Sequence, residues 1–272
     1  MQNPIQKIGN LMQVDGDGYL VNECRWDAIK APWLELVESL RSLCVENCDR
    51  IHSIYLRGSV PRGQSILNIS DLDSVVIIQG ETTPDLGADM LAIEEQLEKQ
   101  YPFCQKVEIS IASDDEVQIS GSHWQALLQT QGLCIYGEDL RSQFPRFAPS
   151  HAMMSHAFDL ADDLAEAKII LRQLSPTQLD FESTIQQKCR WICKRLVRTG
   201  FELVMLRDRT FTRDLYPCYA RFVHYYPDQA QLMYKALELA IQPSSNRDGL
   251  LLFLNHLGTW LVERVEMDID LN

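Results

Sequence analysis

The sequence predicts an α+β protein, in which an α/β domain built on a small mixed sheet precedes an all-α helical-bundle domain. Two observations predict this class. In the first half of the chain, strand-like apolar runs alternate with amphipathic helical runs. From about residue 149 onwards the strand patterns disappear, and helical patterns follow one another. We therefore expect the α/β domain over residues 1–146 and the helical domain over residues 147–272.

Two helices and four strands are expected in the first half. Apolar residues at intervals of three and four predict helices over 32–47 and 85–100. β-Branched runs and alternating apolar residues predict the strands. These strands cover 53–56, 71–78, 106–112 and 133–136.

Five helices are expected in the second half. Their helical periodicity covers 152–174, 183–199, 215–225, 229–241 and 249–266. Proline or glycine separates successive helices, because proline cannot continue a helix and glycine favours its end. The separating residues are Pro176, Gly200, Pro227 and Pro243.

The composition is that of a globular protein with an acidic balance. Of 272 residues, 46% are hydrophobic, and 25 basic side chains face 38 acidic ones, giving a formal net charge of −13. Non-specific binding to nucleic acid depends on clustered lysine and arginine, so this charge argues against a general nucleic-acid binder. It fits a small cationic substrate better.

No apolar run is long enough to span a bilayer, and the first residues have neither the basic start nor the apolar stretch of a secretory signal. We therefore expect a cytoplasmic protein that makes no membrane contact. In that reducing compartment the eight cysteines would remain thiols. Their spacing gives no convincing zinc site, and the oligomeric state is not predicted.

Two carboxylates two residues apart are the first candidate for chemistry. Asp71 and Asp73 lie on an expected strand, so both project from one face of it. Adjacent carboxylates repel unless a cation lies between them, and Mg²⁺ commonly takes one or two carboxylates together with phosphate oxygens. Glu108 would add a third acid if its strand neighbours the first. The alternatives are a solvated strand edge for the two aspartates and an exposed polar face for Glu108.

A glycine and a serine end the strand that comes before these acids. Gly58 would let backbone N–H groups approach a phosphate closely, and the hydroxyl of Ser59 would add a donor. Arg57 and Arg62 flank this turn and could contact a phosphate too, or they are ordinary surface arginines. Together with the acids, Gly58 and Ser59 could hold a metal-bound nucleoside triphosphate.

These motifs resemble the nucleotidyltransferase superfamily that includes DNA polymerase β. The resemblance rests on Tyr-Leu-Arg-Gly-Ser-Val-Pro-Arg-Gly at 55–63, Ser-Asp-Leu-Asp at 70–73 and the acid at Glu108. The arrangement is most similar to bacterial aminoglycoside adenylyltransferases of the streptomycin/spectinomycin type, which carry a C-terminal helical domain. The resemblance implies that Ser59 contacts the triphosphate and that Asp71 and Asp73 hold Mg²⁺. It leaves Glu108 as either the catalytic base or a third metal ligand.

In the adenylyltransferases that this chain resembles, an arginine and a lysine of the helical domain also contact the ATP phosphates. This chain offers Lys188, Arg195 and Arg198 on one expected helix, followed by Arg213, which stands where a lysine would be expected. The spacing from Arg195 or Arg198 to Arg213 matches only with a gap. The solvated face of an amphipathic helix explains the basic residues on the helix equally well.

The sequence thus predicts a Mg²⁺-dependent nucleotidyltransferase that uses ATP. Glu108 would deprotonate a hydroxyl of a small acceptor, which would attack the α-phosphorus of ATP and release pyrophosphate. Two alternatives remain. The acceptor is instead a tRNA or a protein, or the chain is a non-catalytic nucleotide-binding or antitoxin-like protein.

Overall fold

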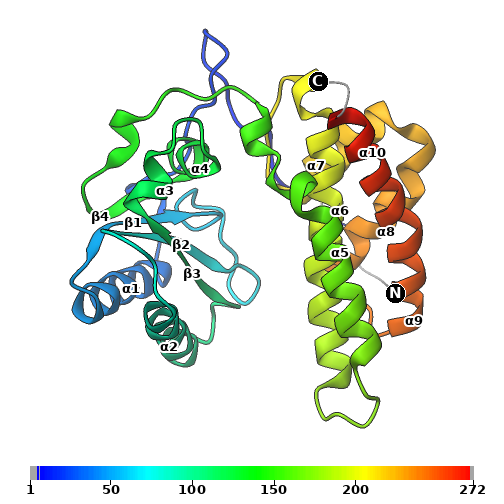
Figure 1. The fold of residues 1–272 in the computed structure, drawn as a ribbon, viewed down its shortest axis with the longest axis horizontal. Helices are drawn as coiled ribbons and strands as arrows, with labels where there is room; N and C mark the ends of the chain where they lie inside the picture. The colour runs from blue at the N-terminus through cyan, green and yellow to red at the C-terminus, as the bar shows by residue number, and fades with distance from the viewer. Residues whose placement is uncertain (1–4, 6, 270–272) are drawn as a thin grey trace. The chain divides into compact units, whose positions relative to one another are not determined.

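The computed structural model describes residue 5 and residues 7–269, and the chain divides into two compact units (Figure 1). Residues 13–148 form the first, which we call the α/β unit. Residues 149–269 form the second, the helical unit, together with residue 5 and residues 7–12. Each unit corresponds to one half of the α+β organisation expected from the sequence.

A four-stranded mixed sheet forms the centre of the α/β unit. Its strands are β1 (Ile51–Arg57), β2 (Leu72–Ile78), β3 (Val107–Ser113) and β4 (Leu133–Gly137), and their order in the sheet is β3-β2-β1-β4. The central strand β1 is antiparallel to β2 and β4, whereas β2 is parallel to β3. This is the small mixed sheet that the sequence predicts, with strand ends shifted by one or two residues.

Helices cover both faces of the sheet (Figure 1). On one face, α1 (Trp33–Asn47) and α2 (Pro84–Gln100) pack buried residues such as Leu36 and Leu97 against Leu56 and Val76. On the other face, Tyr55 and its neighbours pack against α3 (Asp114–Gln118), α4 (His123–Gln131) and the 3₁₀ turn η2 (Leu140–Gln143). Alternate residues of β1, β2 and β3 therefore belong to opposite cores.

The helices α3 and α4 are not expected from the sequence. They span five and nine residues, too few for a helical period to stand out. Local capping starts them instead. Ser113 and Glu116 form a capping box at α3, and the Ser122 hydroxyl accepts a hydrogen bond from the Gln125 N–H at α4.

The helical unit is built around one long central helix. This helix, α6 (Phe181–Asp208), packs against α5 (Ser155–Gln173), α7 (Leu215–Tyr225), α8 (Ala230–Ile241) and α10 (Thr259–Ile269). The helix α9 (Arg247–Phe253) continues into α10 through a π-helical turn, η5 (Leu254–Gly258). Short 3₁₀ turns occur at η1 (Trp26–Ala28), η3 (His151–Met153) and η4 (Pro227–Gln229).

The prediction that a helix ends at Gly200 is wrong, because α6 runs through this residue. Gly200 is buried, and a Cβ atom there would lie 2.5 Å from Met233 Cε and 3.0 Å from Phe222 Cδ2. The glycine therefore permits close packing of α6 against α7 and α8, and it does not end the helix.

The N-terminal residues bind to the loop between α6 and α7. The Met12 N–H donates to the Phe211 carbonyl at 2.8 Å, and the Thr212 hydroxyl donates to the Asn10 carbonyl at 2.7 Å. The Asn10 N–H also donates to Asp214 Oδ2 at 3.1 Å. These long-range contacts explain why residues 7–12 group with the helical unit, although the sequence pattern gave no indication of it.

None of the helices in the described part of the chain is both long and apolar enough to cross a membrane. All eight cysteines are free thiols, and six of them are buried. The buried thiols pack as small apolar groups in the cores.

Candidate active site

Three charged residues form a row across the sheet. Arg57 at the end of β1 pairs in register with Asp73 on β2, and Asp73 pairs with Glu108 on β3. Residues directly opposite each other on neighbouring strands project from the same face of a sheet. The structure therefore brings Asp73 and Glu108 together on one face.

The guanidinium of Arg57 lies between the two carboxylates. Its Nη2 atom is 3.1 Å from Glu108 Oε1 and 3.5 Å from Asp73 Oδ1. The Arg57 side chain is 18% exposed, so these ion pairs are only partly screened by water. The Arg57 guanidinium is thus the cation that offsets the repulsion between the two carboxylates.

A second cation lies beside Glu108. The Lys106 ammonium donates to Glu108 Oε2 at 3.1 Å. Partial burial alone would lower the pKa of Lys106, but the charge of Glu108 and the hydrogen bond to it outweigh this effect and raise it. Asp71 acts on Lys106 in the same direction. Lys106 therefore stays protonated beside the Glu108 carboxylate.

The third predicted acid, Asp71, lies just before β2 and outside its paired residues. Within the described ranges, no group of three or more His, Cys, Asp or Glu side chains is arranged to hold a metal ion. The structure therefore brings together two of the three predicted acids, with Arg57 between them. Asp71 is half-buried and contributes negative charge near Lys106.

The predicted Gly-Ser turn follows Arg57 directly. Gly58 has a φ of +83°, and a Cβ atom at this residue would lie 2.4 Å from Asp73 Oδ2. The Arg62 Nε–H donates to the Gly58 carbonyl at 3.1 Å, and the Gln64 N–H donates to the Ser59 carbonyl at 2.9 Å. The turn is thus held in place, and its backbone lies against the Asp73 carboxylate.

The basic residues predicted in the helical unit fall into two groups. Lys188 and Arg195 each pair with an acid of α5, at 2.8 Å to Glu166 Oε1 and 2.7 Å to Asp163 Oδ2. The structure places Arg198 beside Arg213, because the Arg198 Nε–H donates to the Arg213 carbonyl at 3.4 Å. Burial raises the pKa of the Glu202 carboxyl, and the charges of Arg213 and Arg198 both oppose that rise, so both arginines act on this carboxyl.

The sequence reasoning missed Lys106 and the ion pairs of Arg57. A signal for Arg57 is present, since it immediately precedes Gly58 at the end of an expected strand. The pairing order of the strands was needed to place it opposite Asp73, because strand pairing is non-local.

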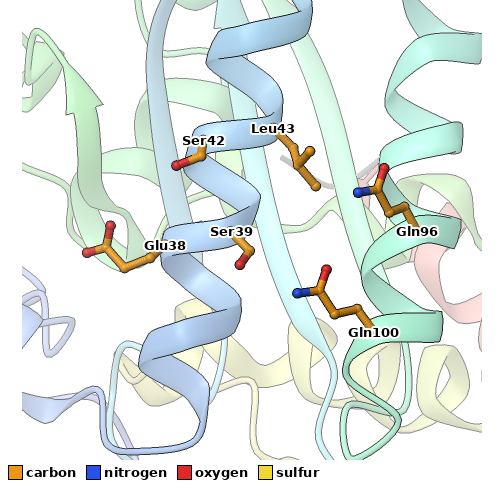
Figure 2. Close-up of a pocket in the computed structure, with 6 residues that line it drawn as sticks. All are labelled: Glu38, Ser39, Ser42, Leu43, Gln96 and Gln100. Carbon is orange, nitrogen blue, oxygen red and sulfur yellow. The ribbon is translucent and has the colours of Figure 1, made fainter.

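The α/β unit also has a surface hollow of about 290 Å³ between α1 and α2 (Figure 2). The residues that line it are Glu38, Ser39, Ser42, Leu43, Gln96 and Gln100. Because α1 and α2 cover the opposite face of the sheet from Asp73, this hollow is separate from the charged row.

No family model and no curated protein matches this sequence. Among solved structures, the chain is similar to spectinomycin adenyltransferase AAD(9) from Enterococcus faecialis, determined with ATP and spectinomycin. The TM-score is 0.50 at 12% sequence identity, and the match covers 84% of this chain and 98% of that one. At this identity the likeness shows the fold. It confirms the adenylyltransferase-like arrangement that the sequence resemblance implied.

Proposed function

We propose that this protein is a nucleotidyltransferase that moves AMP from ATP to a hydroxyl group of a small acceptor. The observation that carries the proposal is the row formed by Arg57, Asp73 and Glu108 beside the Gly58–Ser59 turn. The fold shared with an ATP-bound adenyltransferase supports the same reaction class.

The acids fit a divalent metal in their chemistry. Asp73 and Glu108 already share one cation, the Arg57 guanidinium, so the pair demands positive charge. Mg²⁺ suits such a site, because it binds one or two carboxylates and completes its coordination with water and phosphate oxygens. In the proposal Asp71 and Asp73 hold it, and Glu108 is either a third ligand or the base. The ion would stabilise negative charge that develops on the phosphates.

Of these two roles for Glu108, we propose that of general base. Glu108 pairs with Asp73 on the neighbouring strand, so it lies beside the acid that would hold the metal. It would accept the proton of the acceptor hydroxyl as the acceptor oxygen attacks the α-phosphorus and pyrophosphate leaves. Gly58 and Ser59 would donate hydrogen bonds to the triphosphate.

In the helical unit we propose Arg198 and Arg213 as phosphate-binding residues. Lys188 and Arg195 are further candidates for the same role, and each forms an ion pair with an acid of α5.

For the acceptor, we propose a small molecule that carries amino groups. The formal net charge of −13 favours a cationic acceptor over an RNA.

The ion pair between Arg57 and the acids supports a second candidate function, a protein that binds nucleotide without turnover, because the guanidinium occupies oxygens that a metal would need.

The deciding experiment incubates the protein with α-labelled ATP, Mg²⁺ and fractionated cell extract, and identifies the molecule that gains label. We expect Asp73→Asn to lower transfer by about a hundredfold or more, as losses of transition-state electrostatics commonly do. Asp49→Asn, an exposed aspartate outside the strands, is the matched control and should keep full activity. Unchanged transfer by Asp73→Asn would refute the proposal.

Two further outcomes separate the alternatives. Calorimetry that detects ATP binding, with no labelled product in any fraction, would favour the non-catalytic protein. Label in tRNA, or tRNA binding at physiological salt, would replace the small acceptor with RNA.

A further inference from the structure

Arg57 uses its donors unevenly. A single nitrogen, Nη2, serves both Asp73 and Glu108. Its Nε atom is buried and has no hydrogen-bond partner among the residues that the structure describes. A buried donor without an acceptor is unfavourable, since it has lost water and gained nothing in return. The guanidinium therefore keeps a spare donor for another acceptor.

A divalent metal held by Asp71 and Asp73 would compete with Arg57 for the Asp73 carboxylate. The guanidinium and the metal are both positive, so their repulsion disfavours binding of both at Asp73. The contacts to Asp73 at 3.5 Å and to Glu108 at 3.1 Å are longer than the tightest ion pairs, and both partners are partly exposed. Arg57 can therefore be displaced without breaking a buried core.

Once displaced from the carboxylates, Arg57 is well placed to bind a phosphate group. It immediately precedes the Gly58–Ser59 turn, which we propose as the phosphate-binding turn. A guanidinium matches phosphate oxygens in geometry and charge. Arg62, the other arginine of this turn, already uses its Nε–H to hold the Gly58 carbonyl and so serves the turn itself.

We propose that Arg57 is an exchangeable counter-cation of the active site. Without a divalent metal it neutralises Asp73 and Glu108; when the metal-bound nucleotide arrives, it leaves these carboxylates and donates to a phosphate oxygen. This inference rests on the proposed function, because it takes Asp73 as an acid that holds the metal.

The test measures Mn²⁺ binding to the 272-residue chain without nucleotide, by the electron paramagnetic resonance signal of free Mn²⁺. We expect Arg57→Gln to bind Mn²⁺ about tenfold more tightly than the wild type, because the competing charge is gone. The same variant should bind a non-hydrolysable ATP analogue with Mg²⁺ about tenfold more weakly. For both Mn²⁺ and the ATP analogue, the affinity of Arg57→Lys should lie between those of the wild type and Arg57→Gln.

Arg50→Gln is the matched control. Arg50 donates to the Glu81 carbonyl at 3.1 Å and precedes the opposite end of β1, so its removal should change neither affinity. If Arg57→Gln binds Mn²⁺ no more tightly than the wild type while Asp73→Asn loses binding, the exchange is refuted and the metal site stands. If Asp73→Asn binds Mn²⁺ like the wild type, the metal site of the proposed function fails.

A measurement on the wild type covers the case in which Arg57→Gln does not fold. The Nε–H resonance of Arg57, assigned by its loss in Arg57→Lys, should shift when Mg²⁺ is added and shift again with the ATP analogue. A resonance that stays fixed through both additions overturns the proposal.

Discussion

Gly58 is the residue at which the backbone of the turn comes closest to the acids. Its positive φ alone favours glycine, since other residues are strained in this region. There is also no room for a side chain at Gly58, because an added Cβ atom would lie 2.4 Å from Asp73 Oδ2. Gly58 therefore determines both the shape of the turn and the position of the Asp73 carboxylate.

We expect Gly58→Ala to abolish nucleotidyl transfer, because the methyl group displaces Asp73. Gly121→Ala is the matched control: Gly121 has a φ of +73°, and no heavy atom of the described residues lies within 4 Å of the position that a Cβ would take. Both variants should lose about 1 kcal/mol of stability from backbone strain, measured by thermal unfolding. Only Gly58→Ala should lose transfer in the labelled-ATP assay. Equal activity of the two variants would show that the contact with Asp73 is unimportant.

The residues of the site were predictable to different degrees, for physical reasons. The alternation of a strand fixes the face of Asp73 relative to Leu72, and this is local information. The sequence could place Glu108 beside Asp73 only on the condition that their two strands are neighbours in the sheet. The ion pair with Arg57 depends on the antiparallel register of β1 and β2, which no local pattern contains.

At the scale of elements, a buried glutamate joins two helices of the helical unit. The N-cap position of α5 is Met154, whose side chain cannot supply a capping oxygen. Glu202 of α6 takes this role, since its Oε2 accepts the Ala157 N–H at 2.7 Å. Its Oε1 lies 2.8 Å from His156 Nδ1. Glu202 thus caps α5 from a neighbouring helix and fixes how the two helices pack.

Glu202 should make stability depend on pH. Burial raises its pKa to about 8, although the Ala157 hydrogen bond and the charges of Arg213 and Arg198 act in the opposite direction. Between about pH 5 and pH 8 the unfolded chain has lost this proton while the folded chain retains it, so the contribution of Glu202 to stability falls as pH rises.

Urea unfolding at several pH values measures this effect. Relative to Glu202→Gln, the wild type should lose at most about 1.4 kcal/mol per pH unit across this window. Glu263→Gln, an exposed position on α10, should follow the wild type. Parallel curves for the wild type and Glu202→Gln would show that the carboxyl keeps an ordinary pKa.

Glycines inside helices show why helix boundaries were harder to predict than helix positions. Gly200 lies within α6 because α7 and α8 approach it closely. Gly87 lies within α2, and a Cβ there would meet no heavy atom of the described residues within 4 Å. The sequence cannot distinguish a glycine that ends a helix from one that admits a neighbour. That difference arises from tertiary packing.

The two glycines therefore predict opposite stability changes. Gly87→Ala should stabilise the protein by about 0.5–1 kcal/mol, because alanine is the better helix former. Gly200→Ala should destabilise it by about 1–3 kcal/mol, since the new methyl group meets the ring of Phe222 and the end of Met233. Thermal unfolding of both variants checks the signs, and a stabilising Gly200→Ala would mean that α7 and α8 can move aside without cost.

At the scale of the whole molecule, the α/β unit contains its own core and the complete charged row. The clusters on both faces of its sheet lie within 13–148. Its first residues are tied into the same unit, since the Leu20 N–H donates to the Phe147 carbonyl and the Asn22 amide donates to the Gly132 carbonyl. A chain with its own core and such internal ties meets the conditions for independent folding.

We therefore expect a fragment of residues 13–148 to fold alone and to unfold in one cooperative transition, seen by near-ultraviolet circular dichroism and urea titration. Because Asp71 and Asp73, the proposed metal ligands, both lie within it, the fragment should bind Mn²⁺ with the affinity of the 272-residue chain. It should transfer no AMP, since Arg198 and Arg213, which we propose for the phosphates, are missing. Transfer at the full rate by the fragment would contradict that role, and a fragment without a cooperative transition would show that the α/β core depends on the helical unit.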